Sequence, residues 1–168
     1  MRLKKIIQAD KIVTDWGKWT FGAAMPKTAF PISKSSFKIR STYHWRIAKF
    51  LSLGESFRLL IFYRTDKPEY GAWLGMQRDS DTQLVARYEF HGTHPGWHLH
   101  AHCQTDTAPI GRTLVDGLRI PKSGKCRRTD FSVTSDDKAL YIAAEAFGLP
   151  KGDTGISIGS SSDLFGSW

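Results

Sequence analysis

The stretch QLVARYEFHGTHPGWHLHAHC, residues 83–103, decides the fold. Apolar and polar side chains alternate over residues 83–91, a turn signal follows at residues 92–96, and the alternation resumes over residues 97–103. A period of two is typical of strands that bury one face. The stretch therefore predicts two antiparallel strands joined by a tight turn, and the rest of the chain must supply the other strands of their sheet.

Three more strands are predicted on the N-terminal side of this hairpin. They cover residues 43–53, 57–63 and 70–77, and turn signals separate them at residues 54–56, 66–69 and 79–81. The first of them also fits the spacing of a helix face, but the turn at Gly54 favours a strand. Residues 57–63 are almost continuously apolar, so we expect this strand to be central and covered on both faces.

A helix is predicted after the strands. Thr134 or Ser135 can cap it, and Asp136 and Asp137 suit the positive end of its dipole. Apolar residues mark a buried stripe at helical spacing up to Gly148, a natural stop: Ala139, Leu140, Ala143, Ala146 and Phe147. We therefore expect the α+β class, with a curved antiparallel sheet of about five or more strands and one C-terminal helix packed on it.

The length and composition indicate one domain with two extensions. The chain has 168 residues, of which 40% are hydrophobic and 24% charged, which excludes disorder and low complexity as the basis of function. We expect a basic N-terminal arm over residues 1–36, with short strands rather than a helix because glycines and prolines interrupt it. A single α+β domain over residues 37–150 and a flexible Gly- and Ser-rich tail over residues 151–168 follow.

The sequence favours a reduced, cytoplasmic protein. No apolar run approaches the roughly 20 residues that cross a bilayer, and the first residues lack the apolar core of a signal peptide. The two cysteines, Cys103 and Cys126, are too few for a disulfide framework. We expect a cytoplasmic location, no membrane partner, and a core position for Cys103.

Histidines gather in the stretch that decides the fold. Five of the six histidines lie within twelve residues: His91, His94, His98, His100 and His102. A period of two places His98, His100 and His102 on one face of their strand, and Arg87, Glu89 and His91 on one face of the preceding strand. Matching apolar faces across the hairpin brings the two sets together. Pairing His91 with His98 is one possible register, and a shift by two residues keeps the set intact.

Such a face can support two kinds of chemistry. Imidazoles with a neighbouring carboxylate bind divalent metals, so His98, His100, His102 and His91 are candidate ligands for zinc or manganese. Alternatively, two histidines act without a metal as general acid and base on a phosphodiester, while Arg87 holds the phosphate. The catalytic candidates are His98, His100, His102, Glu89 and Arg87. His44 lies between two aromatic residues and is expected to be structural.

Residues 98–104, HLHAHCQ, resemble the signature of the histidine triad nucleotide hydrolases and transferases, in which histidines alternate with apolar residues. This resemblance implies covalent catalysis with His100 as the nucleophile. It covers seven residues. In that family the signature follows a helix near the C-terminus, whereas here it follows predicted strands and residues 105–168 come after it.

Positive charge is concentrated in two regions. The net charge is +8, and the first fifty residues hold eleven Lys and Arg against two Asp, with aromatic residues interleaved. A second basic cluster occupies residues 119–128. Cations and ring faces together bind the phosphates and bases of nucleic acid, so RNA or another anionic partner is expected. The candidate nucleic-acid-binding residues are Lys122, Lys125, Arg127, Arg128, Arg40 and Arg46.

The sequence therefore predicts a small basic hydrolase, a nuclease or phosphodiesterase acting on RNA or a nucleotide through a metal or through histidine acid–base chemistry. Non-enzymatic alternatives stay open at this point. The first is a nucleic-acid- or protein-binding module with a structural metal or none, and the second is an interaction protein such as an inhibitor. Turnover would separate the enzyme from both.

Overall fold

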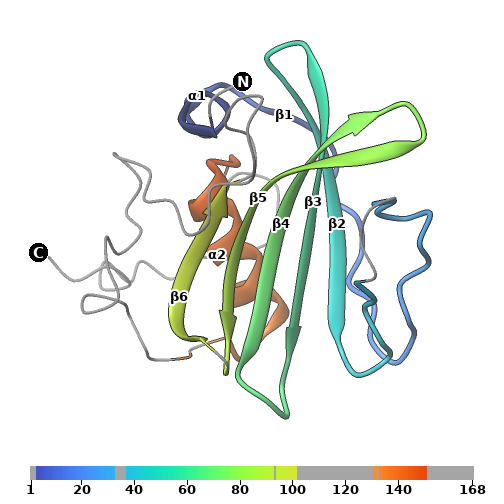
Figure 1. The fold of residues 1–168 in the computed structure, drawn as a ribbon, viewed down its shortest axis with the longest axis vertical. Coiled ribbons are helices and arrows are strands. Elements are labelled where there is room, and N and C mark those ends of the chain that lie inside the picture. The colour runs from blue at the N-terminus through green and yellow to red at the C-terminus, as the bar shows by residue number, and fades with distance from the viewer. Residues whose placement is uncertain (1–2, 33–36, 93, 102–130, 132, 151–168) are drawn as a thin grey trace, which may run out of the picture.

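The computed structural model describes residues 3–32, 37–92, 94–101, 131 and 133–150. A short helix, α1 (Leu3–Gln8), precedes six strands and a second helix. The remaining elements are β1 (Ile12–Asp15), β2 (His44–Ser52), β3 (Glu55–Arg64), β4 (Glu69–Arg78), β5 (Asp81–His91), β6 (His94–Ala101) and α2 (Asp136–Phe147). The strands form one antiparallel sheet in the order of the sequence, and α2 packs on it (Figure 1). The predicted α+β architecture is confirmed.

The sheet has a core on each face, and β3 shows this most clearly. Its residues Leu59 and Ile61 belong to the larger core, which includes the buried stripe of α2 and the apolar side of α1. Its residues Leu60 and Phe62 belong to a second core on the opposite face, closed by the segment that leads into β2. We call these the α2 face and the opposite face. The predicted central strand, covered on both sides, is therefore confirmed.

Helix α2 follows its sequence signals closely. The Ser135 side chain accepts a hydrogen bond from the amide of Lys138 at 3.2 Å, and Gly148 ends the helix in the left-handed conformation. Four residues of the predicted stripe are buried, namely Ala139, Leu140, Ala143 and Phe147, whereas Ala146 is only partly buried and Ala144 is buried in addition.

The N-terminal segment differs from expectation because it begins with a helix. Leu3, Ile6 and Ile7 are buried in the larger core, and their spacing places them on one side of α1. A six-residue helix is marginal by itself, so this packing stabilises it. The expected tail over residues 151–168 lies outside the described residues. No helix in the described ranges has the length and apolar character needed to cross a membrane.

Replacing Ser135 with alanine tests the N-cap of α2. We expect the free energy of unfolding to fall by about 1 kcal/mol, because the amide of Lys138 loses its acceptor. Chemical denaturation of the two proteins measures the difference. Thr134→Ala is the matched control, since Thr134 is exposed and lies one residue outside the cap. Equal destabilisation by both changes would contradict the assigned cap.

Candidate functional site

The β5–β6 hairpin brings most of the predicted site residues to one face. Arg87 pairs with His100 and Glu89 pairs with His98, and after an irregularity in the register His91 pairs with His94. For Arg87 and Glu89 this register is shifted by two residues from the one in which His91 pairs with His98, and it groups them with His98 and His100 as expected. The apolar residues of β6 belong to the larger core, so the histidines lie on the opposite face.

Glu89 is the centre of this group. The residue is only 7% exposed, and the indole Nε1–H of Trp73 donates to its Oε1 at 2.7 Å. Arg87 Nη1 lies 3.5 Å from the same oxygen. The second oxygen, Oε2, lies 3.9 Å from His98 Nε2 and 3.7 Å from His100 Nε2. A carboxylate so far removed from water requires positive charge close by, and this one has three basic side chains around it.

A contact with the backbone sets the orientation of the His98 ring. Its Nδ1 lies 3.0 Å from the carbonyl oxygen of Gly96, and a carbonyl can only accept. Nδ1 therefore carries the hydrogen, so in the neutral ring the lone pair is on Nε2, the atom that faces Glu89. Both Glu89 Oε2 and this lone pair of His98 are hydrogen-bond acceptors, and both residues are buried. The two atoms therefore repel each other unless a proton or a metal ion lies between them.

Glu89, His91 and His98 form a group that could hold a metal ion. One ligand atom from each lies within 4.8 Å of the others. Bonds of about 2.0–2.2 Å to a tetrahedral ion place ligand atoms roughly 3.4 Å apart, so small side-chain rotations would close the site. The Trp73 and Gly96 contacts are the outer interactions that usually orient such ligands. Two imidazoles and a carboxylate suit zinc, manganese or iron.

Two further residues form an outer layer over this group. The side chains of His98 and Glu89 are 3% and 9% exposed, whereas those of His100 and Arg87 are 20% and 27% exposed. The Arg87 guanidinium lies over the Trp73 ring, with its Cζ 5.3 Å from the ring centroid. The site therefore has buried candidate ligands inside, with a basic imidazole and a guanidinium toward solvent.

Trp73 is the site residue that sequence reasoning missed. It comes from β4, where it pairs with Arg87, and it packs against Phe37 with ring centroids 4.1 Å apart. The only signal available was its place in the adjacent predicted strand. Side chains alternate along that strand as they do along the hairpin, and matching the apolar faces would have placed residue 73 on the histidine face.

Several predicted site residues cannot be placed with this group. His102, Lys122, Lys125, Arg127 and Arg128 lie outside the described residues, as do both cysteines. His102 is also the third histidine of the seven-residue resemblance. His94 contributes its backbone to β6. Nucleic-acid binding by the second basic cluster therefore stays a prediction.

Of the two described candidates for nucleic-acid binding, Arg46 lies apart from the histidines. Arg46 is on the α2 face, where its Nε donates to the carbonyl of Trp16 at 2.6 Å and its guanidinium lies 5.9 Å from the Trp19 ring. The sheet thus separates Arg46 from the histidine face. Arg40 is exposed in the segment before β2, three residues after Phe37.

His44 forms a separate cluster at the start of α2. It is stacked between Phe21 and Tyr63, with ring centroids 4.3 and 4.7 Å away, and its Nδ1 lies 3.2 Å from Asp136 Oδ1. Tyr63 donates its hydroxyl to the same carboxylate at 2.7 Å, and burial together with this bond raises the pKa of Tyr63. These contacts join β2 and β3 to α2, which fits the structural role expected for His44.

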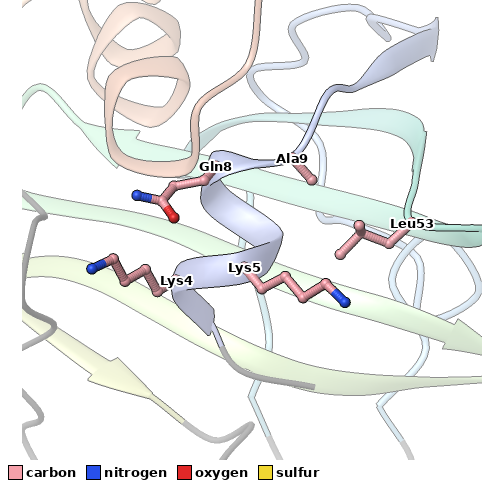
Figure 2. Close-up of a pocket in the computed structure, with 5 residues that line it drawn as sticks. All are labelled: Lys4, Lys5, Gln8, Ala9 and Leu53. Atoms are coloured by element: carbon pink, nitrogen blue, oxygen red, sulfur yellow. The ribbon is translucent and has the colours of Figure 1, made fainter.

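A shallow hollow of about 430 Å³ lies beside α1, lined by Lys4, Lys5, Gln8, Ala9 and Leu53 (Figure 2). In Figure 1, α1, which borders this hollow, lies near the end of the sheet opposite to the one where β5 ends. None of its lining residues is a histidine or a carboxylate, so the hollow has no part in the metal-ligand group.

Comparisons with protein-family models, curated protein sequences and solved structures found no match.

Proposed function

We propose that this protein is a metal-dependent hydrolase of phosphate esters whose metal ion is bound by Glu89, His91 and His98. One observation carries the proposal: Oε2 of Glu89 and Nε2 of His98 face each other 3.9 Å apart while both residues are buried. Gly96 fixes the hydrogen of His98 on the other nitrogen. A divalent cation between these two atoms would bind both, and His91 would supply a third ligand.

The ligand set favours a catalytic ion over a closed structural one. Zinc and manganese both accept imidazole and carboxylate ligands, and the three ligands that the described residues offer leave a position for water. An ion bound there would lower the pKa of such a water toward neutrality and so would favour its attack on a phosphate ester. His100 lies beside the ligands, more exposed than they are, where it can carry a proton between the site and solvent.

The metal mechanism fits better than acid–base cleavage by two histidines. General acid and base catalysts must both reach the substrate. His98 is 3% exposed and its Nδ1 is directed to a backbone carbonyl, so of the two β6 histidines beside Glu89 only His100 is placed to meet a substrate. A net charge of +8 favours an anionic substrate, and RNA or a nucleotide is the class that this charge suits best.

Metal content is the first test of this proposal. We expect metal-free protein to bind about one zinc or manganese ion per chain, and Glu89→Gln and His98→Ala to lose that binding, because the first removes the negative charge of a ligand and the second removes a ligand. Isothermal titration and elemental mass spectrometry measure affinity and stoichiometry. Circular dichroism checks that each variant is folded.

Two matched controls accompany these variants. Glu55→Gln changes a carboxylate that is paired with Arg78 at the start of β3, and His44→Ala removes the histidine on the α2 face. Both should retain the ion. Absence of binding by the wild-type protein, or equal binding by all folded variants, would contradict the proposal. A bound ion without hydrolysis of any phosphate ester would instead favour the binding module with a structural metal.

A further inference from the structure

The geometry points to an anion-binding site at Arg87 that is formed only when the metal ion is bound. This inference rests on the proposed metal site and specifies how that site takes its substrate. The ligand it would accept is a tetrahedral oxyanion, such as inorganic phosphate or the phosphate of an ester.

Arg87 and the metal ion draw on the same negative charge. Arg87 Nη1 lies 3.5 Å from Glu89 Oε1, while the proposed ion would bind the carboxylate through the oxygen that faces His98. Glu89 has a single charge to share. A dication bound to Glu89 therefore weakens the attraction between Glu89 and Arg87, and it also repels the guanidinium directly.

The Arg87 guanidinium is held at the site by more than Glu89. Its Cζ lies 5.3 Å from the centroid of the Trp73 ring, a cation–π contact that does not depend on the carboxylate charge. Its side chain is 27% exposed, so an ion from solvent can reach it. Metal binding would therefore leave a cation beside the ion, with planar N–H groups suited to two phosphate oxygens.

The strand register places this anion next to the proposed proton carrier. Arg87 lies between Trp73 on β4 and His100 on β6. Both Arg87 and His100 belong to the outer layer. A phosphate bound by Arg87 and the metal would thus lie against His100, the position in which a leaving oxygen could receive a proton.

This arrangement predicts effects of opposite sign for one substitution. Arg87→Gln should tighten metal binding, because the ion no longer competes with a guanidinium for Glu89. It should weaken binding of inorganic phosphate to the metal-loaded protein, because the anion loses a ligand. Couplings between two ligands are typically about 5–150-fold, so we expect a change of at least about fivefold in each affinity.

Isothermal titration with Mn²⁺, and then with inorganic phosphate on metal-free and Mn²⁺-loaded protein, measures both affinities. Arg64→Gln is a closely matched control. Arg64 also pairs with a carboxylate two residues along, Asp66, and its Cζ also lies 5.3 Å from a ring, that of Tyr43. It lies at the end of β3, and changing it should leave both affinities unchanged.

The outcomes separate this inference from the proposed function. Tighter Mn²⁺ binding and weaker phosphate binding in Arg87→Gln alone would support it. If Mn²⁺ binds to the wild-type protein but phosphate affinity is the same in wild type and Arg87→Gln, the anion site is wrong while the metal site stands. If the wild-type protein binds no Mn²⁺ or Zn²⁺, the proposed function itself fails.

Discussion

Replacing His100 with alanine is expected to lower the rate of phosphate-ester hydrolysis by roughly 10²–10⁴, the usual contribution of a positioned acid–base group. The metal ion should remain bound, because the three-residue ligand group does not include His100. His100 is 20% exposed and its Nε2 lies 3.7 Å from Glu89 Oε2, so it can exchange protons with solvent while it faces the site. Rates with bis(4-nitrophenyl) phosphate and a single-stranded RNA oligonucleotide, in Zn²⁺ or Mn²⁺, measure the effect.

Addition of free imidazole gives this prediction a second readout. A small imidazole can enter the space left by the side chain and carry the proton, so it should restore part of the rate in His100→Ala. It should have no effect on the wild-type protein. His44→Ala, which removes the histidine stacked on Tyr63, should hydrolyse at the wild-type rate. A His100→Ala protein as active as wild type would exclude His100 as the proton carrier.

The sequence predicted the elements whose signals are local. Helix α2 has its cap, first-turn acids, apolar stripe and terminal glycine within fifteen residues, and apart from Ala146, which is only partly buried, they act as the sequence indicates. The strands β2 to β5 were likewise predicted, from alternation, from one continuous apolar run and from turns. Helix α1 was missed because six residues show too little periodicity, and its formation depends on burying Leu3, Ile6 and Ile7 against distant parts of the chain.

The candidate site was predicted as a face but not as a set of contacts. A period of two was enough to group Arg87, Glu89, His98 and His100. It could not give the register, because the irregularity between Glu89 and His91 and the geometry of the turn decide which residues are opposed. The pattern also could not show which site residues are buried and which are exposed. Their burial depends on Trp73 and on the aromatic residues packed around it.

The close contact between Gly71 and the ring of Phe62 connects the candidate site with this aromatic packing. Gly71 pairs with Glu89 across β4 and β5, and it pairs with Phe62 across β3 and β4. A Cβ added at Gly71 would lie 2.1 Å from Cζ of Phe62. The Phe62 ring therefore occupies the space over Gly71 and packs against Phe37 and Trp73, with centroids 5.3 and 5.7 Å away.

Gly71→Ala is consequently expected to affect stability and metal binding together. Phe62 is 3% exposed and surrounded by other rings, so it cannot turn aside without moving them. Overpacking of this kind costs about 1–3 kcal/mol in the free energy of unfolding. Trp73 should shift with Phe62 and lose its 2.7 Å bond to Glu89, and loss of such an orienting contact weakens metal binding by roughly 10–100-fold.

Denaturation and Mn²⁺ titration of Gly71→Ala measure these two effects. Gly92→Ala is the control, because a Cβ at that position meets nothing within 4 Å. The double variant Gly71→Ala with Phe62→Leu tests the cause, since leucine lacks the ring atoms that the new Cβ would strike. If the clash with Phe62 is responsible, the double variant loses less stability than the two single changes added together. Additive losses would show that the two residues act independently. In that case the packing of Phe62 would not determine the position of Trp73 beneath Glu89.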